Sequence, residues 1–166
     1  MSSTLSPVTP TECRDELAAA LVAVGEQSFF GYVNLAADKE FAAAVATVHQ
    51  WMTAQVDFRG TQRSGRLQMA LPAALAGDML EAFLGLAEPG TAPELTDMIG
   101  EFANMLCGHW LTQRFPTTSF ALARPVVGSD EPGPQVPWVA AAAPLLALLN
   151  EQPVAVWVEC LPEGGA

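Results

Sequence analysis

The sequence predicts an α/β fold of the α+β type, in which long helices cover a mostly antiparallel sheet. Two pairs of compact, β-like runs predict the sheet, one at residues 53–59 and 65–71 and the other at residues 145–149 and 154–161. The connection within each pair is short, which favours antiparallel pairing because parallel strands need long crossovers. Helical apolar spacing elsewhere, most clearly over residues 94–114, predicts the covering layer.

A single domain fits the length of 166 residues better than two domains. We expect it to span residues 11–162, between a flexible tail at residues 1–10 and a frayed tail at residues 163–166. Hydrophobic residues make up 51% of the chain and charged residues 15%, a balance that excludes global disorder.

The N-terminal third begins with a helix from about residue 11, where apolar residues recur at helical spacing. The segment 28–38 interrupts this helix and favours a short strand around residues 30–35. The alanine-rich segment 41–49 favours neither a helix nor a strand.

Apolar residues occupy every second position in the second strand of the first pair. Leu67, Met69 and Leu71 alternate there with Arg66, Gln68 and Ala70. We therefore predict a hairpin here. A proline ends this strand and starts a helix over residues 73–86.

The longest helix, over residues 94–114, begins beside a proline and ends before Pro116. A strand is expected over residues 117–123, and a proline- and glycine-rich acidic loop over residues 129–137. The run 145–149 is also compatible with a short helix.

The charge balance excludes two classes of partner. The formal net charge is −11 with only seven Lys and Arg residues, so neither nucleic acid nor an anionic membrane surface is expected to bind. No apolar stretch reaches the roughly 18–20 residues that span a bilayer. The first ten residues lack the basic region and apolar core of a secretory signal, so a cytoplasmic protein is expected.

The chain lacks the usual motifs of a self-contained enzyme. It has no phosphate-binding glycine loop and no nucleophile elbow. Its two histidines and three cysteines are widely spaced, which argues against a metal site or a disulfide framework. We expect this chain to bind no cofactor and no metal of its own.

One face of the longest helix carries polar residues that could act on a partner. Helical steps of four, three and four join its members, which are Asp97, Glu101, Asn104 and Gly108. Small neighbours, including Gly100, are expected to let another protein approach closely. Taken alone, the pattern is typical of a solvated helix face.

The run Asp97-x3-Glu101-x2-Asn104 resembles the signature helix of the CheC/CheX/FliY phosphatases of chemotaxis. Pro125 lies near the place where that family has a proline, and residues 122–128 resemble its strand end and P-x-x-G turn. Residues 65–85 are similar to its hairpin-then-helix segment.

The resemblance implies an enzyme that removes the aspartyl phosphate from a CheY-like response regulator. Asn104 and Glu101 would be the catalytic residues. Asn104 would orient the attacking water, and Glu101 would pair with a lysine of the regulator. Asp97, Gly108 and Pro125 would support them. The regulator would supply Mg²⁺.

The resemblance also leaves alternatives open. Glu16 is followed three residues later by Ala19, so the first helix lacks a second signature and one site per chain is expected, as in CheX. A homodimer is expected from the family alone. The rival functions are a non-catalytic CheX-like module that binds a response regulator or another signalling protein, and an unrelated structural domain with a fortuitous Glu-x2-Asn.

Overall fold

The computed structural model describes residues 10–28, 31–35, 38–85, 90–129 and 136–161. The helices are α1 (Pro10–Ser28), α2 (Asp38–Val45), α3 (Ala73–Leu84) and α4 (Ala92–Arg114). The strands are β1 (Val33–Asn34), β2 (Trp51–Arg59), β3 (Ser64–Pro72), β4 (Ala121–Leu122), β5 (Val126–Ser129), β6 (Leu145–Leu149) and β7 (Gln152–Leu161). The tails predicted at residues 1–10 and 163–166 lie outside the described residues, except that Pro10 begins α1.

The strands form one antiparallel sheet in the order β1-β6-β7-β3-β2-β4, with β5 also paired to β2. Both predicted hairpins are present: β2 pairs with β3 and β6 pairs with β7. The fold class expected from the sequence is therefore confirmed.

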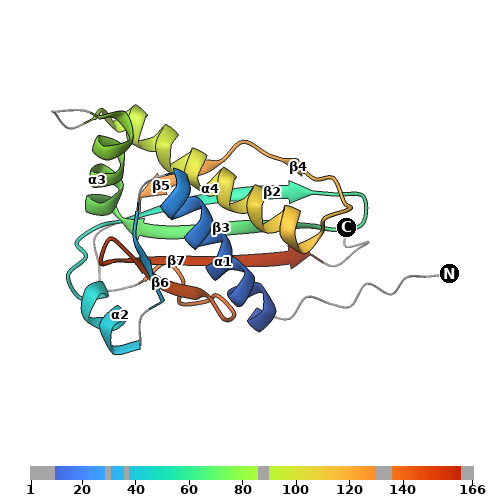
Figure 1. Cartoon of the computed structure of the whole chain (residues 1–166), viewed down its shortest axis with the longest axis horizontal. Helices are drawn as coiled ribbons and strands as arrows, with labels where there is room; N and C mark the ends of the chain where they lie inside the picture. The colour runs from blue at the N-terminus through green and yellow to red at the C-terminus, as the bar shows by residue number, and fades with distance from the viewer. Residues whose placement is uncertain (1–9, 29–30, 36–37, 86–89, 130–135, 162–166) are drawn as a thin grey trace.

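Helices α1 and α4 lie side by side across one face of this sheet, and α3 lies near one end (Figure 1). Alternate residues of the strands point toward these helices and form the main core with them. In β2, for example, Val56 and Phe58 are buried there, whereas Gln55 and Asp57 point to the opposite face. We call the face beneath α1 and α4 the helix face and the other the open face.

A second, smaller apolar cluster covers part of the open face. The Trp138 ring lies there between Phe41 of α2 and Trp51 of β2. Its centroid is 5.7 Å from that of Phe41 and 4.9 Å from that of Trp51. Helix α2 therefore covers part of the face opposite α1 and α4. The sequence of residues 41–49 favoured neither a helix nor a strand. Helix α2 forms because Phe41 has this cluster to pack against.

Turn chemistry closes the second hairpin. Asn150 and Glu151 both have positive φ, 51° and 67°, as a two-residue turn between twisted strands requires. The Asn150 side chain also accepts a hydrogen bond from the backbone N–H of Tyr32, at 2.8 Å, which fixes the turn against the residue preceding β1. The run 145–149 is thus a strand, and the short-helix alternative is wrong.

The structure corrects the prediction for residues 117–123. Only Ala121–Leu122 forms a strand, because the chain turns after α4 and the backbone N–H of Thr118 bonds to the carbonyl of Phe115. The next strand is instead Val126–Ser129, where the sequence had suggested a strand end and a turn. Its β-branched valines pair with β2.

A partly buried polar contact ties α1 to α4. The Glu16 carboxylate accepts hydrogen bonds from the indole N–H of Trp110, at 3.0 Å, and from Arg114, at 2.9 Å. Among the described segments, no helix is both long enough and apolar enough to cross a membrane.

Candidate functional site

Helix α4 begins at a well-formed cap. The Thr91 hydroxyl accepts a hydrogen bond from the backbone N–H of Glu94, at 3.3 Å, and donates one to the Glu94 carboxylate, at 3.0 Å. Pro93 occupies the first turn, where its missing N–H costs nothing. The start of the helix, and with it the register of the residues that follow, is therefore fixed.

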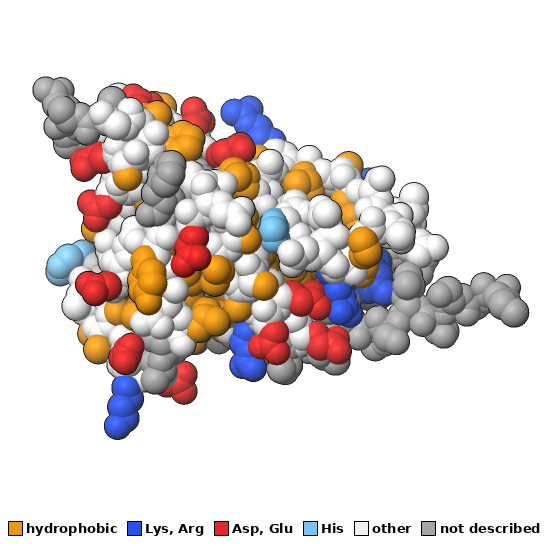
Figure 2. All heavy atoms as spheres, in the orientation of Figure 1, with side chains coloured by type: hydrophobic (Ala, Val, Ile, Leu, Met, Phe, Trp, Pro, Cys, Tyr) orange, Lys and Arg blue, Asp and Glu red, His pale blue; other side chains and the backbone are white. Residues whose placement is uncertain are grey.

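The buried side of α4 sets which residues face outward. Nine of its residues are buried, among them Ile99, Phe102 and Trp110. The predicted site residues lie on the opposite side as one ridge, made of Asp97, Glu101, Asn104 and Gly108. Asp97 and Glu101 are exposed, and Asn104 and Gly108 are half-buried. We call these four residues the α4 ridge. Figure 2 shows its side of the molecule, with many acidic and few basic side chains.

Two polar groups of the α4 ridge have no partner among the described residues. Neither Glu101 nor Asn104 makes a side-chain hydrogen bond or ion pair with another residue in the described segments. A carboxylate and an amide thus stand one helical turn apart with unused hydrogen-bonding capacity. The ridge is therefore able to bind cations or oriented polar groups presented by another molecule.

Pro125, predicted as a supporting residue, lies against this helix. A Cβ added to Gly100 would be at ordinary contact distance, 3.4 Å from the Pro125 Cβ and 3.6 Å from a Val127 methyl, so the start of β5 packs against α4 at Gly100. This contact corrects the role expected for the small neighbours. Gly100 and Ala103 are buried within the chain and do not receive a partner.

The first helix offers no second ridge of this kind. Glu16, the residue from which a second signature would start, is bonded to Trp110 and Arg114. Its carboxylate is therefore engaged in holding α1 to α4. The expectation of one site per chain rests on the sequence and stays a prediction.

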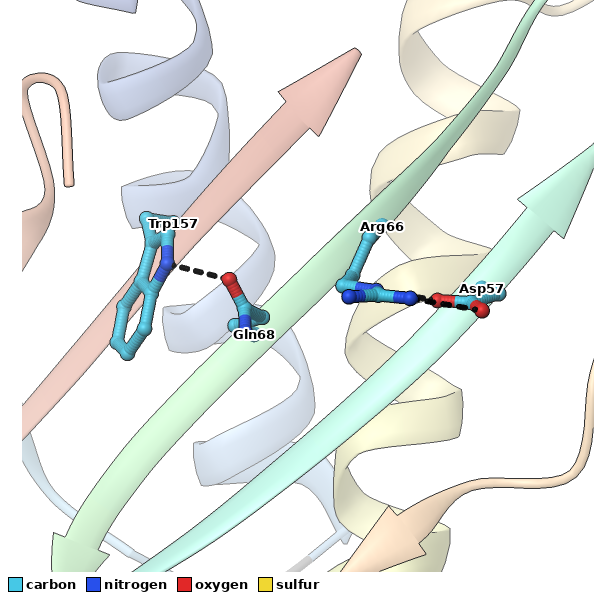
Figure 3. A network of polar contacts seen from close by, with 4 residues as sticks. All are labelled: Asp57, Arg66, Gln68 and Trp157. Carbon is cyan, nitrogen blue, oxygen red and sulfur yellow. Dashed lines mark hydrogen bonds and ion pairs between the residues drawn. The ribbon is translucent and has the colours of Figure 1, made fainter. Parts of the chain in front are cut away.

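Sequence reasoning missed a row of polar pairs on the open face of the sheet. Arg66 donates to both carboxylate oxygens of Asp57, at 2.6 and 3.2 Å, and the indole N–H of Trp157 donates to Gln68, at 2.8 Å. Figure 3 shows these side chains on the side of the strands away from the helices. Each pair joins residues that are directly opposite on neighbouring strands, so knowledge of the strand register would have revealed them.

A hollow of about 520 Å³ lies beside the Asp57–Arg66 pair on the open face. It is larger than the groove of about 320 Å³ beside the α4 ridge, but two of the charged residues that line it, Asp57 and Arg66, are already paired with each other. A ligand there would have to compete with an existing ion pair. The α4 ridge, whose polar groups are free, is the better candidate for a site.

The Asp57–Arg66 pair should give the unfolding free energy a weak dependence on acid pH. The hydrogen bond from Arg66 holds the pKa of Asp57 below its usual value. The contribution of the pair to the unfolding free energy is thus complete above the pKa that Asp57 has in the unfolded chain. It is lost as the pH falls through the lower pKa that Asp57 has in the folded protein. Because the side chains are 48% and 41% exposed, solvent screening keeps it below about 1 kcal/mol.

Urea denaturation of the wild type and of Asp57→Asn checks this prediction. Wild type should be slightly more stable at about pH 7, and the difference should shrink toward about pH 3. The prediction would be contradicted by a difference in unfolding free energy that is the same at both pH values.

In the part of the chain that the structure describes, no group of three or more His, Cys, Asp and Glu residues could hold a metal ion. Cys13 and Cys107 are buried, and burial raises the pKa of their thiols to about 11 and about 12. Neither thiol is therefore suited to act as a nucleophile at neutral pH.

Similar solved structures share this fold. The crystal structure of the chemotaxis protein CheX from Vibrio vulnificus is 17% identical, with a TM-score of 0.65, and the match covers 93% of this chain and 100% of that one. A putative chemotaxis protein from Desulfovibrio vulgaris Hildenborough is 15% identical, with a TM-score of 0.63 and the same coverage. The CheX-CheY-BeF3-Mg²⁺ complex from Borrelia burgdorferi contains a chain 9% identical, with a TM-score of 0.54, covering 93% of this chain and 99% of that one.

The comparison with curated proteins gave no match. The family model described as chemotaxis phosphatase CheX matches residues 52–136, slightly more than half of the 166 residues. The matched range contains the whole α4 ridge and Pro125. The chain therefore belongs to the CheX family.

Proposed function

We propose that this protein hydrolyses the aspartyl phosphate of a CheY-like response regulator in chemotaxis-type two-component signalling. The observation that carries the proposal is the α4 ridge, where Glu101 and Asn104 stand side by side with no partner among the described residues. Membership of the CheX family and the existence of a CheX–CheY complex among the similar structures support it.

The regulator brings most of the chemistry to the reaction. Its Mg²⁺ and lysine neutralise charge on the phosphoryl group, and what it lacks is a water held in line with the scissile bond. The water oxygen forms a bond to phosphorus while the bond to the aspartate oxygen breaks. Inorganic phosphate and a free aspartate carboxylate result. An enzyme for this step needs no metal or nucleophile of its own.

Asn104 is the residue proposed to hold that water. Its amide can accept one hydrogen bond from the water and donate others, and it carries no charge that the phosphoryl oxygens would repel. It is half-buried on a rigid helix, which limits the orientations that the amide can take.

Glu101 is proposed to dock the helix on the regulator by pairing with its lysine. The side chain is exposed and lies one turn from Asn104, so a single approach can engage both. Asp97 extends the acidic ridge toward the start of α4. Pro125 supports the ridge through its contact with Gly100.

The proposed partner also determines where this chain would act and where Mg²⁺ would come from. A phosphorylated receiver domain is a cytoplasmic protein, so this chain would act in the cytoplasm, and Mg²⁺ would enter the complex with the regulator. The homodimer expected from the family stays a prediction, as does the single domain over residues 11–162.

The test is the decay of the acyl phosphate on candidate regulators from the same organism, with wild type, with Asn104→Ala and with no added chain. We expect wild type to accelerate the decay and Asn104→Ala to lose about 10²-fold of that acceleration or more. Binding without acceleration would favour the non-catalytic module. Neither binding nor acceleration, with the domain folded, would overturn the proposal.

A further inference from the structure

A groove of about 320 Å³ runs between α1 and α4 beside the α4 ridge. Ala23 and Val24 of α1 line one wall, and Met105 and Gly108 of α4 line the other. Gly108 therefore belongs both to the ridge and to the groove. Because a helix rises 1.5 Å per residue, Gly108 lies about 6 Å along α4 from Asn104, and Met105 brings the groove closer still.

Nothing in the described part of the chain requires a glycine at position 108. A Cβ added there would meet no atom within 4 Å, whereas one added to Gly100 would contact Pro125. Glycine inside a helix is less favourable than alanine, so the fold alone would be better served by a side chain. No described residue fills the space over Gly108, and a partner that docks on Asn104 would cover it.

A polar atom beside the groove also lacks a partner. Nε2 of His109, a residue that lines the groove, is buried and has no hydrogen bond with any described residue. Unsatisfied buried groups are unfavourable and are uncommon in folded proteins. An occupant of the groove that brought an oxygen atom, with a small turn of the imidazole, would satisfy it.

We propose that this groove receives an uncharged, mainly apolar side chain from the regulator, on the surface beside its phosphorylated aspartate. The inference rests on the proposed function. Among the described residues, the lining contains apolar and neutral polar groups and no Asp, Glu, Lys or Arg, in contrast to the acidic ridge next to it. The ridge would then supply charge recognition, and the groove would add shape recognition and select among regulators.

The experiment compares Gly108→Met with Gly77→Met. Gly77 lies inside α3, away from the lining of the groove, and a Cβ added there also meets no atom within 4 Å, so it is a matched control. With a regulator that wild type dephosphorylates, Gly108→Met should raise KM at least about tenfold and change kcat less than about threefold, because Asn104 is untouched. Gly77→Met should leave both values unchanged.

Alanine variants show that the two sites tolerate a side chain. Gly108→Ala and Gly77→Ala should each raise the melting temperature by about 2 °C. Binding to the beryllofluoride-activated regulator should weaken with Gly108→Met and not with Gly77→Met.

A Gly108→Met protein with wild-type KM and wild-type binding would overturn the groove proposal and leave the phosphatase standing. A wild-type protein that neither binds nor dephosphorylates any regulator would overturn both.

Discussion

Asn104→Asp should reduce dephosphorylation further than Asn104→Ala while leaving the fold unchanged. The two side chains of Asn and Asp have the same shape, so the helix is not disturbed. The carboxylate, however, would face the phosphoryl oxygens, and two unit charges about 4 Å apart repel by about 4 kcal/mol at a protein surface. This repulsion lowers the rate of dephosphorylation further than the loss of about 10²-fold that is expected for removing the water-orienting amide.

The measurement is the rate of acyl-phosphate loss at saturating and subsaturating enzyme. Gln113→Glu is the matched control, because Gln113 is exposed on the same helix outside the α4 ridge and the variant adds the same charge. It should keep wild-type activity. If Asn104→Asp is as active as wild type, the amide does not orient the water and the proposed mechanism is wrong.

Trp110→Ala should lower the unfolding free energy by about 3–5 kcal/mol, because it removes one of the largest fully buried side chains. The Trp110 ring packs edge-on against Phe58 and Phe115, with centroids 5.9 and 6.1 Å apart. Its indole N–H also bonds to Glu16, so the variant breaks part of the tie between α1 and α4.

Trp138→Ala is the comparison, since Trp138 is also buried but belongs to the small cluster on the open face. Both variants should be less stable in urea, but only Trp110→Ala should also lose phosphatase activity at temperatures where it stays folded. A loss of stability below about 1 kcal/mol for Trp110→Ala would show that the α1–α4 layer repacks without it.

The parts of the fold with strong local patterns were predictable. The alternation of Leu67, Met69 and Leu71 identified β3, and the long helical spacing identified α4 to within two residues of its start. The short strand β1 lies within the segment where one was expected, but helix α2 and strand β5 were not predictable. Helix α2 depends on Phe41 reaching a cluster of tryptophans, and β5 depends on pairing with β2, and neither contact leaves a periodic trace in its own segment.

The candidate site was also predictable only in part. Helical steps alone placed Asp97, Glu101, Asn104 and Gly108 on one face, and the structure has them there. The contact of Pro125 with Gly100 and the groove along α1 depend on how distant segments pack, so the sequence could not reveal them. The catalytic roles of Glu101 and Asn104 stay predictions.

The nine buried residues of α4 have a consequence for any attempt to transplant the site. A synthetic peptide copying this helix would present those apolar side chains to water, and an isolated helix with such a face aggregates or unfolds. The four residues of the α4 ridge would then lose their common orientation. Inhibitors or reporters of the interaction are therefore better built on the whole domain, where the sheet holds the ridge in place before the regulator arrives.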